Sequence, residues 1–205
     1  MEERVTFAVG DITLEGLLAI PAKPASVGVV VCHPHPLYGG EMHNNVVTAL
    51  TDGFARAGIA TLRFNFRGVG GSGGRHDEGN GEQDDVKGAV GYLLSRLQVA
   101  TVAVAGYSFG SFVGLRAGAA DPRVHKLIGV ALPIARRDVS FLAAVTKPKL
   151  LISGDRDDIS PAVRLGELFD SLPEPKALAL VRGADHFFQG SEREVADRAT
   201  AFLSK

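Results

Sequence analysis

Residues 99–120 read VATVAVAGYSFGSFVGLRAGAA. The apolar run Val99–Ala105 predicts a buried strand, and the apolar spacing from Phe112 to Ala119 predicts a helix. Between them lies Gly106-Tyr107-Ser108-Phe109-Gly110, which matches G-x-S-x-G. In this motif a sharp turn between strand and helix lifts a serine hydroxyl above the edge of a sheet. Glycines suit such a turn, because a strained backbone leaves little room for side chains. Ser108 is therefore the candidate nucleophile.

The pattern recurs at Gly70-Gly71-Ser72-Gly73-Gly74, and in a chain with 25 glycines a chance match is a real risk. The residues that follow Ser72 do not favour a helix, so this copy lacks the strand–turn–helix context. The same region contains G-x-G-x-x-G, the dinucleotide-binding pattern, at Gly68, Gly70 and Gly73. That pattern requires an immediate helix and an acidic residue about 20 positions later. The helix is expected only from about Asp85, and residues 86–120 contain no Asp or Glu, so we expect no nicotinamide or flavin cofactor.

Strands are predicted on both sides of this segment. Arg4–Val9 and Ile12–Ile20 alternate apolar with other residues around Gly10-Asp11, which is typical of an antiparallel hairpin. Continuous apolar runs, typical of strands covered on both faces, follow at Val27–Cys32, Ala60–Phe64, Leu127–Leu132, Leu150–Ser153 and Ala177–Val181.

Helices are predicted between these strands. They are expected from Val46 to Ala57 before a Gly58 C-cap, from an Asp84-Asp85 N-cap to Leu97, from a Ser160 N-cap followed by Pro161, and from about Glu192 to Phe202. The order of elements predicts one α/β domain over residues 1–205. Its sheet is expected to be mostly parallel, with an antiparallel N-terminal hairpin and helices on both faces.

Composition argues against several classes of partner. Lys and Arg number 22 against 23 Asp and Glu, the net charge is −1, and no basic stripe is present, so we expect no nucleic-acid partner. Cys32 is the only cysteine, which excludes an intramolecular disulfide. No apolar stretch approaches the ~20 residues that span a bilayer, and the charged start lacks a signal peptide's apolar run. We expect a soluble cytoplasmic protein without a membrane partner; the sequence does not indicate its oligomeric state.

A serine hydroxyl needs a base that takes its proton, and histidine is the usual base near neutral pH. Among six histidines, His186 stands in GADHFF at 183–188, between the last predicted strand and the last predicted helix. A loop at the carboxyl end of a strand is where α/β sheets bind ligands. His43, His76 and His125 are expected to be surface or capping residues. His186 is therefore the candidate base.

Three aspartates directly follow the predicted strand Leu150–Ser153, in the segment GDRDD at 154–158. They lie between nucleophile and base in chain order, as the acid of a serine–histidine site on this kind of sheet does. One of Asp155, Asp157 and Asp158 is expected to orient His186, and the residues alone do not distinguish them. Turn formation and helix capping are the structural roles of such aspartates.

The order of segments and three loop motifs resemble the α/β-hydrolase superfamily, in particular its small dienelactone-hydrolase-like members without a large cap domain. Besides the turn Gly106–Gly110 around Ser108, which we call the elbow, the motifs are Arg67-Gly68-x-Gly70-x-Ser72, Gly154-x-x-Asp157-x-Ile159-x-Pro161 and Ala184-Asp185-His186-Phe187. The resemblance covers essentially the whole chain. In that family the acid lies three residues after such a glycine, which implies Asp157. A minimal lid is also implied, because only Ala135–Val145 stands where lid helices enter.

Acyl transfer needs two N–H donors that face the developing oxyanion. The residue after the nucleophile supplies one, so Phe109 is the first candidate. The second is expected in the loop after Val27–Cys32, which reads HPHPLYGG at 33–40 where many relatives have His-Gly. Because proline has no N–H, His35 is the expected donor and Leu37 the next.

His33-x-His35 is also a possible metal pair, but a zinc site takes at least three protein ligands and no third stands nearby in sequence. We therefore expect no metal and no other cofactor. The prediction is a carboxylesterase-like serine hydrolase that acts on a small acyl substrate through a Ser-His-Asp triad and an acyl-enzyme. The nearest alternative is a thioesterase with the same machinery, and an alternative of another class is a non-catalytic binding protein on this scaffold.

Overall fold

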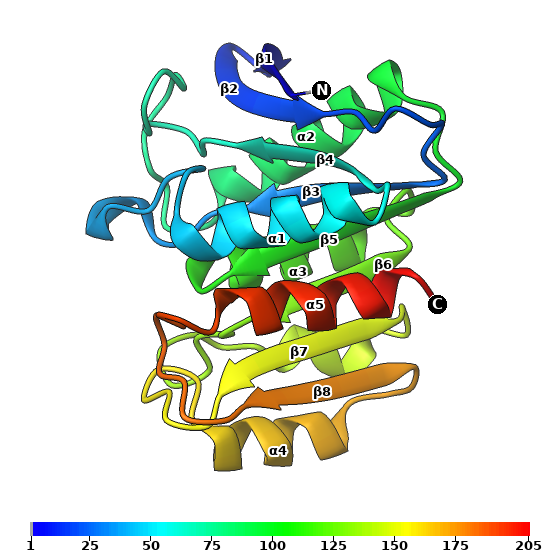
Figure 1. The fold of residues 1–205 in the computed structure, drawn as a ribbon. Coiled ribbons are helices and arrows are strands. Elements are labelled where there is room, and N and C mark those ends of the chain that lie inside the picture. The colour runs from blue at the N-terminus through cyan, green and yellow to red at the C-terminus, as the bar shows by residue number, and fades with distance from the viewer. Residues whose placement is uncertain (1) are drawn as a thin grey trace.

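The computed structural model describes residues 2–205, which form an eight-stranded sheet (Figure 1). Its strands are β1 (Glu2–Val9), β2 (Ile12–Ala19), β3 (Val27–Cys32), β4 (Ala60–Phe64), β5 (Thr101–Tyr107), β6 (Lys126–Val130), β7 (Lys149–Gly154) and β8 (Lys176–Val181). They lie in the order β1-β2-β4-β3-β5-β6-β7-β8. β1 and β2 form an antiparallel hairpin, and β2 pairs antiparallel with β4. The other six strands, β3 to β8, are all parallel to one another. The predicted fold class is confirmed.

Helices cover both faces of the sheet. Within the described residues they are α1 (Asn45–Arg56), α2 (Gly81–Arg96), α3 (Phe109–Ala120), α4 (Ala162–Ser171) and α5 (Glu192–Leu203). In Figure 1, α1 and α5 lie on the near face, and α2 and α3 lie behind the sheet. Val29 and Val31 of β3 belong to the apolar cluster on the α1 side, and Val30 and Cys32 belong to the cluster on the α2 side. This two-sided burial explains why the parallel strands are continuously apolar. No helix in the described part of the chain has the length and apolar character needed to cross a membrane.

The start of α2 differs from the sequence prediction. The helix begins at Gly81, and the predicted N-cap pair Asp84-Asp85 lies inside it. The fully buried Glu82 carboxylate accepts hydrogen bonds from the N–H groups of Asp77 and Gly79, at 2.8 and 2.9 Å. A buried acid in the first turn therefore organises the loop before the helix, a role that its local sequence does not reveal.

Two other boundaries also differ. α4 begins at Ala162 with Pro161 at its N-cap, so the prediction that Ser160 caps this helix was wrong. The Ser160 N–H donates instead to Asp157 Oδ1 at 2.8 Å, which makes Ser160 part of the loop after β7. The strand predicted at Val99–Ala105 runs from Thr101 to Tyr107, directly up to the candidate nucleophile.

The parallel strands end at one edge of the sheet, on the left in Figure 1. From β3 the chain passes through α1 to β4, whereas from β5 it passes through α3 on the other face to β6, in the opposite direction along the sheet. Open α/β sheets bind ligands at such a switch point, beyond the carboxyl ends of the strands. The loops after β3, β4, β5, β7 and β8, which contain the residues predicted to be functional, all lie at this edge.

The loops after β7 and β8 lie so close to each other that Gly154 has no room for a side chain. A Cβ at this position would overlap the carbonyl oxygen of Ala184. We predict that Gly154→Ala lowers the free energy of unfolding by about 1–3 kcal/mol, the usual range for overpacking. Urea denaturation measures this change. The matched control is Gly166→Ala in α4, where nothing lies within 4 Å of the added Cβ. Gly166→Ala should raise the free energy of unfolding by about 0.5–1 kcal/mol. Similar effects of the two substitutions would contradict the close contact between the loops after β7 and β8.

Candidate active site

Ser108 lies at a strained turn between β5 and α3. Its φ of 53° and ψ of −118° fall outside the regions that residues with a side chain favour. The turn requires glycine on both sides, because a Cβ at Gly106 would overlap the Gly110 carbonyl oxygen and one at Gly110 would overlap that of His33. The Ser108 N–H is bound to the Val130 carbonyl oxygen at 2.9 Å. The turn thus holds the half-buried Ser108 at the carboxyl edge of the sheet.

The three residues selected from the sequence as nucleophile, base and acid lie in one hydrogen-bonded line. Ser108 Oγ is 2.9 Å from His186 Nε2, and His186 Nδ1 is 2.8 Å from Asp157 Oδ2. His186 is 7% exposed and Asp157 3%, so the second of these contacts is shielded from water. With Nδ1–H donating to the carboxylate, Nε2 is free to accept the serine proton.

Asp157 uses its two oxygens for different contacts. Oδ1 accepts the N–H groups of Ile159 and Ser160, each at 2.8 Å, while Oδ2 faces His186. Burial by itself would raise the pKa of Asp157, but the hydrogen bonds from His186 and from these two N–H groups outweigh it and hold the pKa below its ordinary value. The carboxylate therefore stays ionised while it fixes both the loop and the imidazole.

The other two aspartates of this loop are exposed and do not contact His186. Asp155 Oδ1 accepts the Gly183 N–H at 2.6 Å and so joins the loop after β7 to the loop that carries His186. The Asp158 carboxylate makes no hydrogen bond or ion pair within residues 2–205. Of the three candidates, the structure brings only Asp157 to the histidine.

Tyr107, one residue before Ser108, helps to position the loop of His186, a role that was not predicted from the sequence. Its hydroxyl donates to the His186 carbonyl oxygen at 2.8 Å and so holds the loop after β8 against the elbow. Burial raises the pKa of this phenol, which keeps the hydroxyl protonated as a donor. The presence of a tyrosine in a buried strand could have indicated this role, because a buried Tyr hydroxyl usually has a hydrogen-bond partner.

His33, the first residue of the His-x-His pair, has both ring nitrogens occupied. Nε2 accepts the Phe66 N–H at 3.0 Å, and Nδ1 therefore carries the proton and donates to the Pro34 carbonyl oxygen at 2.7 Å. Burial lowers the pKa of His33 to about 4 although the Pro34 contact favours the charged form. His33 is thus a neutral bridge between the loops after β3 and β4.

His35 and Phe109, the two predicted oxyanion donors, are neighbours with ring centroids 4.8 Å apart. Phe109 is the first residue of α3, where a backbone N–H has no partner within the helix. The described residues supply no acceptor for the N–H of either residue. The Leu37 N–H, the alternative donor, already lies 3.3 Å from His35 Nδ1.

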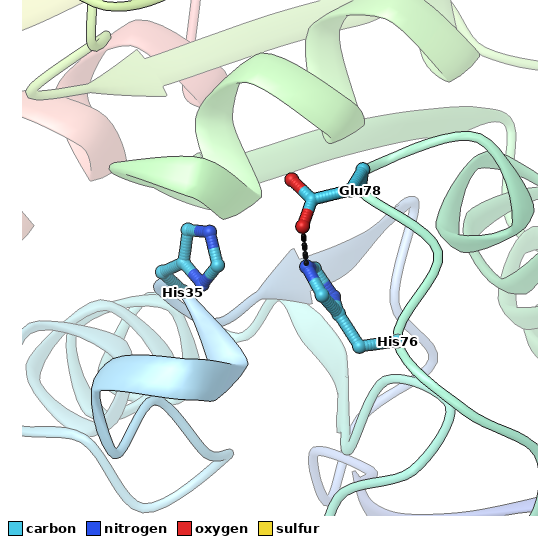
Figure 2. A group of neighbouring side chains, drawn as sticks. All are labelled: His35, His76 and Glu78. Atoms are coloured by element: carbon cyan, nitrogen blue, oxygen red, sulfur yellow. Dashed lines mark ion pairs between the residues drawn. The ribbon is translucent and has the colours of Figure 1, made fainter.

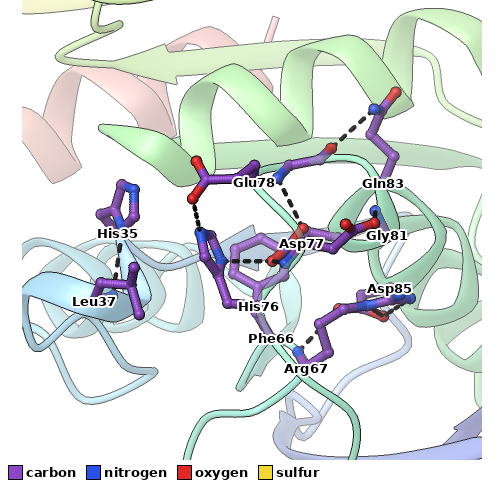
Figure 3. Close-up of polar contacts among 12 residues, drawn as sticks. His35, Leu37, Phe66, Arg67, His76, Asp77, Glu78, Gly81, Gln83 and Asp85 are labelled. Carbon is purple, nitrogen blue, oxygen red and sulfur yellow. Dashed lines mark hydrogen bonds and ion pairs between the residues drawn. The ribbon is translucent and has the colours of Figure 1, made fainter.

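The glycine-rich segment 66–80, which we call the β4 loop, is fixed by buried polar contacts (Figure 3). The serine of the second G-x-S-x-G, Ser72, is buried there; its Oγ donates to the Asn65 carbonyl oxygen at 2.7 Å and accepts the Glu15 N–H at 3.0 Å. Arg67 pairs with the buried Asp85 at 2.8 Å. An open groove of about 780 Å³ is lined by this loop, the β1–β2 hairpin and the loop after β3, but Ser108, His186 and Asp157 do not line it.

Sequence comparison places the chain among known hydrolase folds. Residues 29–140 match the family described as alpha/beta hydrolase fold. An uncharacterized protein of Rickettsia prowazekii (strain Madrid E) is 32% identical in a 199-residue alignment that covers 93% of this chain and 84% of the relative.

Solved structures agree along nearly the whole chain. An alpha-beta serine hydrolase homologue from Coxiella burnetii superposes with a TM-score of 0.91 at 33% identity, over 98% of this chain and 97% of the other. A serine hydrolase without lid from Xanthomonas campestris gives 0.88 at 32% identity, over 99% and 94%. An esterase of Pyrococcus furiosus shares the fold, with a TM-score of 0.86 at 18% identity over 100% and 92% of the two chains. The chain therefore belongs to the alpha/beta hydrolase fold family.

Proposed function

We propose that this protein is a serine hydrolase that cleaves carboxylic esters with Ser108 as nucleophile, His186 as base and Asp157 as orienting acid. The observation that carries the proposal is the continuous line of contacts from Ser108 Oγ through His186 to Asp157, at 2.9 and 2.8 Å. A scaffold kept only for binding would need neither a strained serine nor a buried base and acid aligned with it. The relatives described as serine hydrolases and as an esterase support the same reaction class.

In the proposed reaction, Ser108 Oγ attacks the substrate carbonyl carbon while His186 Nε2 takes the hydroxyl proton. The resulting tetrahedral intermediate expels the alcohol, to which His186 returns the proton, and an acyl-enzyme on Ser108 remains. Water attacks this ester in the same way, and the acid leaves with the serine restored. Asp157 keeps the imidazole in the Nδ1–H form and stabilises the imidazolium.

The proposed oxyanion donors are the backbone N–H groups of Phe109 and His35. Phe109 begins α3, so the partial positive charge of the helix N-terminus adds to its N–H. Preorganised donors of this kind usually supply the largest electrostatic contribution to acyl transfer.

The site suits a small or surface-accessible acyl substrate. Between β6 and β7, where lid helices enter this fold, the chain forms only the short 3-10 helix Ser140–Ala144. Leu37, Tyr38 and Phe187 are exposed apolar residues in the loops that carry His35 and His186. They offer apolar contact area for an acyl or alcohol group. Thioesters react by the same steps, so a substrate panel should pair esters and thioesters of equal chain length.

The first test is covalent labelling with a fluorophosphonate. The wild-type protein should be labelled, Ser108→Ala should abolish labelling, and Ser72→Ala should retain it, because Ser72 is engaged with Asn65 and Glu15. Mass spectrometry of the digested protein identifies the modified residue. An adduct on Ser72, or none on folded wild-type protein, would refute the proposed function.

The second test compares Asp157→Asn with Asp155→Asn and Asp158→Asn in steady-state kinetics. An amide in place of the Asp157 carboxylate would favour the wrong imidazole tautomer, and in a comparable triad this change lowered kcat by about 10⁴. By comparison with that triad, we expect Asp157→Asn to lower kcat by at least about a thousandfold. Asp155→Asn and Asp158→Asn are the matched controls and should keep near-normal kcat. A large loss in either control with little loss in Asp157→Asn would reassign the acid.

The third test separates the backbone and the side chain of residue 35. His35 has a φ of −60°, a value that proline adopts, so His35→Pro removes the N–H with little change in this torsion. His35→Ala removes the imidazole and keeps the N–H. We expect kcat for His35→Pro to be about 10²–10³ below that of His35→Ala, as for loss of one oxyanion donor. Equal kcat in two variants with matching circular dichroism spectra would exclude the His35 N–H as a donor.

A further inference from the structure

We propose that His35, His76 and Glu78 form a binding site for a divalent metal ion of the zinc type, separate from the Ser108–His186–Asp157 line. Figure 2 shows the three side chains facing one another, with His35 from the loop after β3 and the other two from the β4 loop. One potential ligand atom of each residue lies within 4.8 Å of the other two. Two imidazoles and one carboxylate with an open fourth position form a donor set that zinc takes in proteins.

His76 is the central ligand. Its side chain is 10% exposed, and neither ring nitrogen has a hydrogen-bond partner of good geometry within the described residues. Two carboxylates nevertheless lie close, with Glu82 Oε1 2.7 Å from Nδ1 and Glu78 Oε1 3.5 Å from Nε2. A metal ion on Nε2 with Nδ1 directed to Glu82 reproduces the carboxylate–histidine–metal arrangement of known sites. Without an ion, only these two carboxylate contacts, which lack hydrogen-bond geometry, offset the burial of the imidazole.

Glu78 is held in an unusual conformation that suits a ligand. Its φ of 52° lies in the left-handed region, which is rare for residues other than Gly, Asn and Asp, and such strain gathers at functional sites. Glu78 Oε2 lies 3.3 Å from Arg137 Nη2, which leaves Oε1 facing His76. The Arg137 guanidinium itself lies against the rings of Phe109 and Phe112.

The β4 loop holds its two ligands in place before any ion arrives. Glu82 accepts the N–H groups of Asp77 and Gly79, which flank Glu78 in the chain. Ligand atoms around one zinc at about 2.0–2.2 Å lie about 3.3 Å apart, so the cluster must contract. His35, on the other loop, is the residue that must move. Its Nδ1 now faces the Leu37 N–H, and metal ligation through either ring nitrogen would end this contact, because Nδ1 would then hold the metal or the ring proton.

The test is zinc titration of untagged, EDTA-treated and dialysed full-length protein by calorimetry, with the melting temperature measured in parallel. We expect one zinc ion per chain and a zinc-dependent rise in melting temperature, because an ion that binds only the folded state stabilises it. Glu78→Gln and His76→Gln should each weaken zinc binding by at least about tenfold, since changes outside the ligand shell already cost 10–100-fold. Glu41→Gln and His43→Gln, in the neighbouring loop outside the cluster, are matched controls and should bind as the wild type does.

Glu78 is exposed, so Glu78→Gln should fold normally and decides the outcome even if His76→Gln does not fold. Its metal-free melting temperature should equal that of the wild type. Absence of zinc binding, or binding that survives Glu78→Gln or is lost in the two controls, would overturn the proposal. Because binding and melting are measured instead of hydrolysis, failure here leaves the proposed function untouched.

Discussion

The strained backbone of Ser108 is the constraint on which the rest of the site depends. A residue with a side chain held at a φ of 53° costs roughly 1–3 kcal/mol, so the surrounding structure must hold it there. Gly106 and Gly110 leave room for the turn, and the bond from the Ser108 N–H to Val130 fixes it to the neighbouring strand. One turn thereby sets the position of the hydroxyl and of the Phe109 N–H together.

The parallel sheet brings the other residues of the site to the same edge as Ser108. Ser108 and His186 are 78 residues apart in the chain and His186 and Asp157 are 29 apart, yet all three follow parallel strands that end at the same edge. The hydrogen bond from the Tyr107 hydroxyl to the His186 carbonyl oxygen holds the loop after β8 against the elbow. The hydrogen bond from the Gly183 N–H to Asp155 joins that loop to the loop after β7. The proposed chemistry thus rests on rigid loop ends rather than on a closing lid.

Much of this arrangement could be predicted from the sequence because its signals are local. Apolar runs identify the strands, and the strand–turn–helix context separates Ser108 from Ser72. What could not be predicted depends on contacts between distant segments. His33 and His35 look equivalent in HPHP, but the Phe66 N–H occupies His33 whereas His35 lies beside His76. The other two candidate metal ligands, His76 and Glu78, were missed for the same reason, because they come from the loop after a different strand.

The role of Ser108 as nucleophile is tested most directly by trapping the covalent acyl-enzyme. The protein is mixed with an activated ester such as p-nitrophenyl butyrate, quenched in acid at early times, digested and analysed by mass spectrometry. We expect a butyryl group on Ser108 that accumulates during turnover and disappears when the substrate is consumed. Hydrolysis that proceeds at full rate with the acyl group on another residue, or with no acyl-enzyme in the wild type and undiminished turnover in Ser108→Ala, would contradict it.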